Sequence, residues 1–137
     1  MTQPQVFQEL EHVRLIIFAA LPCKKNQRAG TGRRSHYPQD VRSQLDTMTL
    51  QARCQWGCRK PIAHPDIEVT MYVANFSKDG DGIWVSVLDC LKRAGVIVDD
   101  SLRWLNGTLL VHPAVEVPAR EERIEIVLEF PKGAADR

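Results

Sequence analysis

The sequence contains no long apolar run. A membrane-spanning helix needs about 20 consecutive apolar residues, and the stretch VRLIIFAAL at 13–21 is much shorter. That stretch follows Glu9 and Glu11, whereas a secretory signal peptide opens with basic residues. We therefore expect neither a membrane span nor a signal peptide, and we expect a cytoplasmic protein.

A disulfide framework, an internal repeat and a large net charge are also lacking. The four cysteines, Cys23, Cys54, Cys58 and Cys90, are scattered along the chain. Without a secretory signal they are expected to be reduced thiols. The net charge of +1 does not by itself indicate a polyanionic partner. A length of 137 residues suits one domain with a modest core.

Charge is nevertheless segregated along the chain, and this is more informative than its sum. The segment 24–34, KKNQRAGTGRR, is basic, and 77–100 holds five aspartates. The basic segment has two glycines and little apolar content, which is typical of a loop. Its basic residues, which we expect to contact phosphates, are Lys24, Lys25, Arg28, Arg33 and Arg34.

Hydrophobic periodicity predicts two helices. Pro38 suits the first turn of one helix, which we expect to end near Trp56–Gly57. Its apolar face is formed by Val41, Leu45, Met48 and Ala52. A second helix is predicted at about 82–94, with Gly95 as its stop. Its apolar face is formed by Ile83, Val87, Leu88, Leu91 and Ala94.

Strands are predicted before, between and after these helices. The run VRLIIFAA at 13–20 suits a strand buried on both faces. The segments 66–76 and 122–130 alternate between apolar and polar residues. Segment 102–117 allows two interpretations, a hairpin on Asn106-Gly107 or a turn followed by one strand at 108–112.

The order of elements predicts a single small α/β domain, with a mixed sheet flanked by two main helices. This domain spans the whole of 1–137. We expect a flexible arm at 1–12 and a flexible tail at 131–137.

The aspartates at the two ends of the second helix suggest a cation site. Asp79 and Asp81 point the same way if the backbone is extended there. Asp99 or Asp100 would add a third carboxylate if the following loop folds back. Carboxylates without nearby histidine or cysteine favour Mg²⁺ or Mn²⁺ over zinc. Ordinary turn chemistry is the alternative interpretation, because Asp and Gly are favoured in turns.

These residues resemble the RusA family of Holliday-junction resolvases. The family pattern has an aspartate pair one residue apart, a helix and then G-x-x-x-D-D. The chain matches it with Asp79 and Asp81 followed by LDCLKRAGVIVDD at 88–100, and LPCKKNQRAGTGRRSHYP at 21–38 is similar to the family's basic loop. The resemblance implies a homodimer that cuts four-way DNA junctions with Mg²⁺ or Mn²⁺ in recombination and repair. It also implies that the catalytic, metal-binding residues are Asp79, Asp81 and Asp100.

The chain departs from the family pattern at two positions. Gly82 stands where the family often has asparagine, and Val85 stands where it has a functional lysine. A lysine would stabilise charge on the phosphate. Either another cation, such as Lys78, Lys25 or Arg33, replaces it, or the protein is a weakly active or inactive junction-binding module.

Other patterns have ordinary structural interpretations as alternatives. Cys54, Cys58 and His64 would suit a zinc-stabilised adaptor, but a fourth ligand is not evident. Asp89 lies opposite the apolar face of its helix and is expected to be a solvated charge. Trp56 and Trp84 are expected to be core residues.

Overall fold

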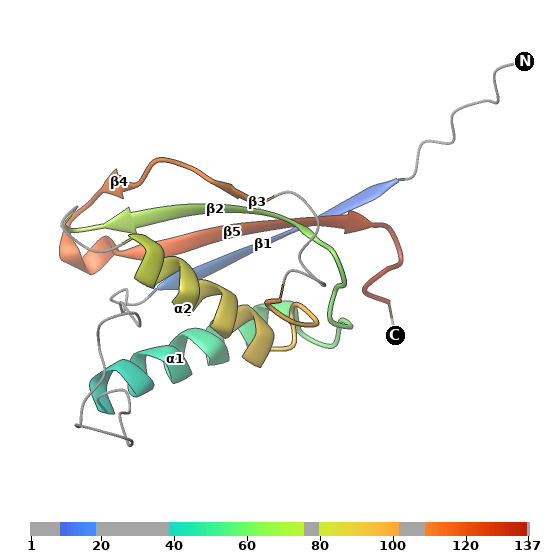
Figure 1. Cartoon of the computed structure of the whole chain (residues 1–137), viewed down its shortest axis with the longest axis horizontal. Helices are drawn as coiled ribbons and strands as arrows, with labels where there is room; N and C mark the ends of the chain where they lie inside the picture. Colours follow the sequence, from blue (N-terminus) through green and yellow to red (C-terminus); the bar gives the residue numbers. More distant parts are fainter. Residues whose placement is uncertain (1–8, 19–38, 76–79, 102–108, 137) are drawn as a thin grey trace, which may run out of the picture.

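A computed structural model describes residues 9–18, 39–75, 80–101 and 109–136. Side chains are not described at 39–41 and 80–84. Two helices lie on one face of a five-stranded sheet (Figure 1). This confirms the predicted mixed sheet with two main helices.

Five strands of the described residues build the sheet. They are β1 (Leu10–Phe18), β2 (Asp66–Val73), β3 (Leu109–Val111), β4 (Val115–Glu116) and β5 (Arg123–Pro131). The order is β1-β5-β2-β3, with β4 also pairing with β2. β5 is antiparallel to both β1 and β2, whereas β3 and β4 run parallel to β2. The sheet is therefore mixed. Its parallel pair, β2 and β3, is connected through α2.

The helices are α1 (Gln39–Trp56) and α2 (Gly80–Arg93), and a short 3₁₀ helix, η1 (Ala119–Glu121), precedes β5. Each α-helix is followed by a glycine with positive φ, Gly57 (69°) and Gly95 (76°). Glycine adopts this conformation without a Cβ clash, so it can end a helix. Gly95 is thus the helix stop that the sequence predicted.

The core lies between the sheet and the helices. β2 and β5 alternate strictly, with every second side chain buried against α1 and α2. The predicted face of α1 is confirmed at Leu45, Met48 and Ala52, which are all buried. Trp56 is also buried and meets Phe130 edge-on, with ring centroids 5.8 Å apart.

β1 differs from the prediction. It begins at Leu10, inside the segment expected to be an arm, and it is buried on one face only. Leu15 and Ile17 are fully buried, but Phe18 is 57% exposed. The expectation of a strand buried on both faces is wrong because, among the described residues, the helices cover a single face of the sheet.

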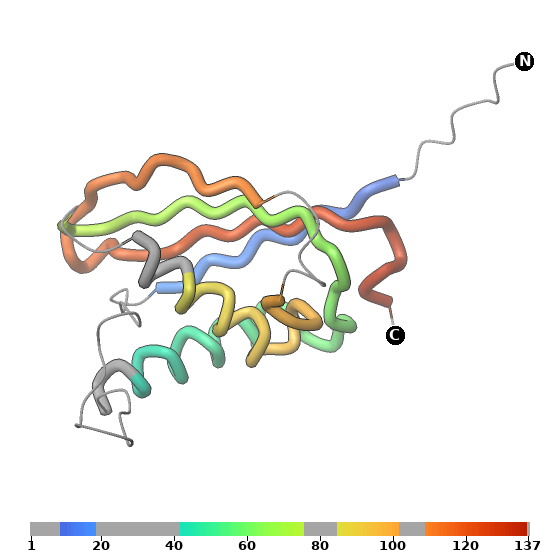
Figure 2. The backbone as a smooth tube through the Cα atoms, in the orientation of Figure 1, coloured from blue at the N-terminus to red at the C-terminus, as the bar shows by residue number. Residues whose placement is uncertain are grey.

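The segments after α2 and β5 are packed. The bridge between Ile62 and Ile97 joins the loop before β2 to the chain that leaves α2, and the two segments lie side by side in Figure 2. Beyond β5, Ala135 is buried and its carbonyl accepts a hydrogen bond from Lys60 N at 2.9 Å. Residues 132–136 therefore form a turn that contacts the domain through Ala135, in the segment for which a flexible tail was expected.

Segment 102–117 is described only from Leu109 onward, where β3 pairs in parallel with β2. A strand near 108–112 belongs to both interpretations, so the choice between them stays open. Asn106-Gly107 lies outside the described residues. The predicted strand 66–76 is shorter than expected and ends at Val73.

Candidate functional site

The acidic residues after α2 form a compact cluster with one lysine. Lys92 Nζ lies 3.0 Å from Asp99 Oδ1 and 3.7 Å from Asp100 Oδ1. Asp100 N also donates a hydrogen bond to Asp99 Oδ1 at 2.9 Å. The Lys92 ammonium is thus held between two carboxylates that come after its own helix.

The charges in this cluster shift one another's pKa. The hydrogen bond from Lys92, helped by those from Asp100 N and Ser101, lowers the pKa of Asp99. The same hydrogen bond, with the charges of both aspartates, raises the pKa of Lys92. All three side chains are partly exposed, so water screens these interactions.

The loop that carries the cluster is held at the C-terminal end of α2. Val96 N donates to Leu91 O at 2.9 Å, and Val98 N donates to Ile62 O at 3.1 Å. These bonds leave Asp99 and Asp100 beside the last turn of the helix. In Figure 1 the segment after α2 lies at the end of the helix away from β4.

Asp81 lies at the other end of α2. The helix begins at Gly80, so the backbone of Asp81 is in its first turn. Eleven residues separate Asp81 from Lys92, which corresponds to about 16 Å along a helix axis. Within one chain, Asp81 and Asp100 therefore mark opposite ends of α2, and the loop that carries Asp100 does not fold back along it. Asp79 lies outside the described residues.

The C-terminal end of β2, from which the chain leads to α2, is held by hydrogen bonds from two neighbouring segments. Val117 N donates to Val73 O at 2.9 Å, and Ala74 N donates to Glu122 Oε1 at 2.8 Å. Glu122 is a buried carboxylate, with 8% of its surface exposed. The sequence did not single it out, although it shares the even-numbered register of the buried residues of β5.

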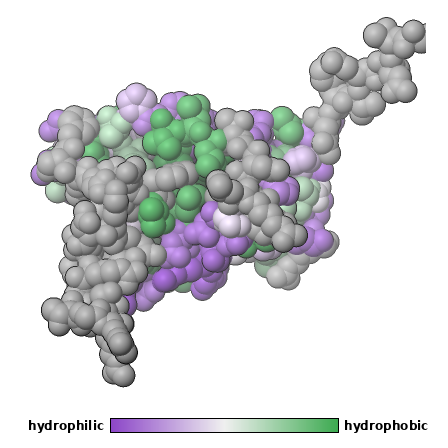
Figure 3. All heavy atoms as spheres, viewed as in Figure 1, coloured by the Kyte–Doolittle hydropathy of each residue, from purple (hydrophilic) through white to green (hydrophobic). Residues whose placement is uncertain are grey.

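Val85 lies in the second turn of α2, because the helix starts two residues earlier than predicted. Its side chain is 46% exposed. Positions i and i+4 are neighbours on a helix surface, so Val85 is next to Asp81. Figure 3 shows apolar side chains gathered on the face of the molecule that carries α2.

Other predicted residues have structural roles or lie outside the described part. Asp89 is only partly exposed and pairs with Arg93 at 3.0 Å, so it is not simply a solvated charge. The side chain of Trp84 lies outside the described part of the structure. The basic residues that were expected to contact DNA all lie outside the described residues: Lys24, Lys25, Arg28, Arg33 and Arg34.

The cysteine pattern does not form a metal site in the described residues. Cys54 and Cys58 are exposed free thiols. The described part of the chain includes both of them and His64, and it contains no group of three His, Cys, Asp or Glu side chains that could hold a metal ion.

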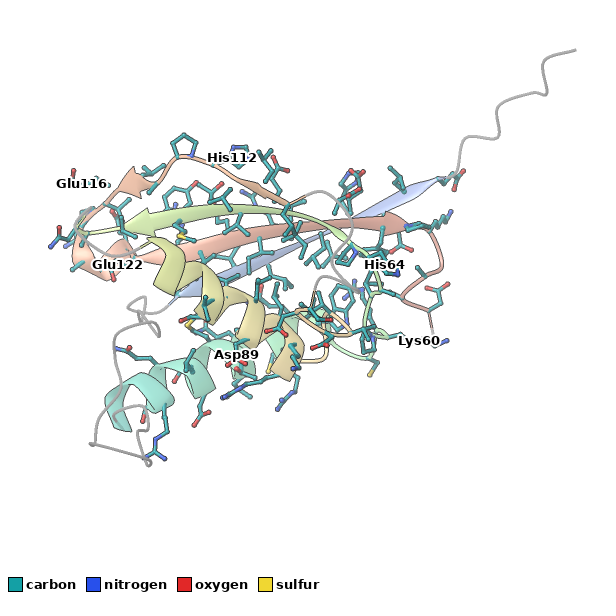
Figure 4. The ribbon with its side chains drawn as sticks, viewed as in Figure 1. Lys60, His64, Asp89, His112, Glu116 and Glu122 are labelled. Carbon is teal, nitrogen blue, oxygen red and sulfur yellow. The ribbon has the colours of Figure 1, made fainter. Side chains whose placement is uncertain are left out.

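The outer face of the sheet carries two histidine–carboxylate pairs. His12 Nε2 lies 2.5 Å from Glu129 Oε2, and His112 Nε2 lies 2.6 Å from Glu68 Oε1. His112 lies beside β3 on this face (Figure 4). A shallow cavity of about 280 Å³ is lined by Asp66, Glu68, Glu129 and His12, among others.

Searches of protein-family models and of curated proteins find no match to this chain. The resemblance to the RusA family therefore rests on the residues that carry it. In the described parts of the chain, no helix has both the length and the apolar character that crossing a membrane requires.

Proposed function

We propose that the chain is a metal-dependent, structure-selective endonuclease that resolves four-way DNA junctions by hydrolysing phosphodiester bonds, in DNA recombination and repair. The observation that carries the proposal is the pair of acidic segments at the two ends of α2. The proposed catalytic and metal-binding residues are Asp79, Asp81 and Asp100. When bound, Mg²⁺ or Mn²⁺ would polarise a phosphoryl oxygen and activate water.

The donor set fits such an ion, because carboxylates are the ligands that Mg²⁺ prefers. The length of α2 means that one chain would not bring Asp81 and Asp100 to the same ion. We therefore propose a homodimer in which Asp79 and Asp81 of one copy share a site with Asp100 of the second copy.

A two-fold axis suits this arrangement. If the α2 helices of two copies pack antiparallel, the first turn of each helix meets the last turn of the other. Two equivalent sites would result, which matches symmetric cutting of a two-fold junction.

The segment 24–34 is proposed to bind the DNA backbone. It comes after β1 in the chain and carries five basic residues and no acid. Contacts between these residues and phosphates would release counterions, so affinity would fall steeply with salt. Replacing Arg33 and Arg34 with alanine would weaken binding and flatten the salt dependence.

The test is cleavage of a synthetic four-way junction with Mg²⁺, with a linear duplex of the same sequence as the control substrate. The natural protein should cut the junction, and Asp81→Asn should bind it without cutting. A protein that binds the junction but does not cut it with Mg²⁺ or Mn²⁺ would favour a non-catalytic junction-binding module. Val85 supports that second candidate, because the family lysine is absent.

A mixed dimer tests the shared site. When Asp81→Asn and Asp100→Asn chains are combined, one site of the dimer carries both changes and the other carries none. The mixture should therefore regain cutting that neither variant has alone. If each site belonged to one chain, both sites of the mixed dimer would be damaged and no activity would return.

A further inference from the structure

Phe18, Arg123 and Tyr72 form an aromatic row across the outer face of the sheet, and the proposed cutting site does not use it. Phe18 of β1 and Tyr72 of β2 both pair in register with Arg123, which lies on β5 between them. Each of the three is next to a buried residue of its own strand. Because side chains alternate between the faces of a sheet, all three point to the face that α1 and α2 do not cover (Figure 1).

The row offers two flat surfaces. Phe18 is 57% exposed, so its ring presents apolar surface to solvent. Arg123 Cζ lies over the Tyr72 ring, 3.8 Å from its centroid, which is within the range of a cation–π contact. Arg123 Nη1 also donates a hydrogen bond to Glu121 O at 3.1 Å, and this bond helps to hold the guanidinium. The Phe18 ring is one surface, and the guanidinium over Tyr72 is the other.

The spacing and chemistry of these surfaces suit unpaired nucleobases. Phe18 and Arg123 lie on neighbouring strands, which are about 4.8 Å apart in a sheet. Two successive nucleotides of one strand can therefore contact both. Bases stack on aromatic rings and on arginine planes. Such stacking depends little on sequence, because every base has a π-face.

The charges of the outer face restrict where a nucleic acid can lie. Arg123 belongs to the row, and Arg14 lies on the same face in the middle of β1, where it pairs with Glu125 at 3.2 Å and keeps 62% of its side chain exposed. Asp66 and Glu129 lie opposite each other, six residues along the strands from the row, which corresponds to about 20 Å. Their carboxylates would repel phosphates, so a strand should cross the sheet at the aromatic row and not at the acidic end.

We propose that the aromatic row binds unpaired bases of a single-stranded nucleic acid, with one base on Phe18 and the next on Arg123. This inference goes beyond the proposed cutting, because none of the three residues belongs to the proposed metal site. Loss of one stacking residue typically weakens binding about 5- to 150-fold.

The test uses the full chain and a fluorescein-labelled oligothymidylate of about 12 nucleotides, with binding followed by fluorescence anisotropy. Phe18→Ala should weaken binding at least about fivefold, whereas Phe18→Trp keeps a ring and should bind as the natural protein does. Leu10→Ala is the matched control, since Leu10 is an exposed apolar residue on the same face of β1. It should leave binding unchanged.

Two further comparisons separate stacking from charge. An abasic oligomer of the same length keeps the phosphates but has no bases, so it should bind weakly, and Phe18→Ala should not weaken it further. Arg123→Lys keeps the charge but lacks the planar group, so it should weaken binding of oligothymidylate and not of the abasic oligomer. Urea unfolding of each variant checks that the fold is kept.

The same series with an oligouridylate identifies whether DNA or RNA supplies the bases, because the preferred strand should bind more tightly. The inference is overturned if the natural protein binds oligothymidylate and oligouridylate no more tightly than the abasic oligomer. It is also overturned if Phe18→Ala binds as Leu10→Ala does. A protein that binds oligothymidylate in this way but does not cut a junction would remove the proposed function and leave this inference in place.

Discussion

Gln55 and Ile16 exchange two hydrogen bonds. Ile16 N donates to Gln55 Oε1 at 2.8 Å, and Gln55 Nε2 donates to Ile16 O at 2.7 Å. Gln51 makes the same pair with Phe18, one helical turn away and two strand residues further on. The amides of α1 thus occupy part of the outer edge of β1, as a neighbouring strand would. Open strand edges invite pairing with other chains, so this contact closes part of the edge.

We predict that the double variant Gln51→Ala, Gln55→Ala is less stable and self-associates more readily. The variant loses four hydrogen bonds, and water replaces them in part. The free energy of unfolding should therefore fall by roughly 1–3 kcal/mol. Urea unfolding would measure the stability and light scattering the association. Cys54→Ala is the control, since Cys54 is an exposed residue of the same helix. Equal stability of the double variant and the control would contradict the prediction.

The stability of the protein should fall at high pH because of Cys90. Burial raises the pKa of this thiol from 9.0 to about 11. The unfolded chain then loses the proton first, so the folded state is disfavoured as pH rises from about 9 to about 11. The full effect of two pKa units is on the order of 2–3 kcal/mol.

This pH dependence can be measured as the difference between the natural protein and Cys90→Ala in urea unfolding at pH 8 and at pH 10.5. The natural protein should lose more stability over this interval. In a companion experiment at pH 8, a thiol reagent should modify Cys54 and Cys58 quickly and Cys90 only after unfolding. Rapid modification of Cys90 in the folded protein would contradict the assigned burial.

We expect Lys92→Ala to lower the Mg²⁺ concentration needed for cutting. In the proposed site, the Lys92 ammonium would compete with the metal ion, because it already contacts the Asp99 and Asp100 carboxylates. Its removal should also return the pKa of Asp99 toward the usual value, which carboxyl NMR titration can follow. Arg93→Ala is the matched control, because Arg93 pairs with Asp89 instead. An unchanged Mg²⁺ requirement in Lys92→Ala would indicate that Asp100 is not a metal ligand.

Val85→Lys should accelerate cutting at unchanged DNA affinity. A lysine at this position would be an i+4 neighbour of Asp81. In the proposed site it would place an ammonium beside the DNA phosphate that the metal ion holds. Electrostatic stabilisation of this kind is worth about 10²–10³ in rate. Because Val85 is 46% exposed, the substitution should cost little stability. Single-turnover cleavage of a four-way junction provides the measurement, and a slower variant would direct attention to Lys78 as the cation.

The sequence predicted the parts of the fold that depend on local pattern. Leu45, Met48 and Ala52 repeat at helical spacing, so the buried face of α1 could be found without a structure. The burial of β1 could not be predicted in this way, because an apolar run does not reveal which faces of a strand other elements cover. Phe18 is exposed because it alternates with the buried Leu15 and Ile17 and so lies on the face of the sheet that α1 and α2 do not cover.

The candidate site was predictable in composition but not in geometry. The spacing of the aspartates indicated carboxylate ligands, and the likeness to a family suggested that all three meet. The separation of Asp81 from Asp100 within one chain results from the path of the chain, since hydrogen bonds to Leu91 and Ile62 hold the loop before Asp99 at the far end of α2. Glu122 was missed although it continues the alternation that buries Ile124 and Ile126, because a glutamate at the start of a strand is ordinarily exposed.

The position of β5 has a consequence for how the protein folds. β5 lies between β1 and β2, and it is the last strand of the described chain to be synthesised. Until β5 has been synthesised, β1 has no strand with which to pair, because Leu10 at its start pairs with Pro131 at the end of β5. Contacts between residues so distant in sequence slow folding. On the ribosome, we therefore expect the sheet to form late, after α1 and α2 have been made.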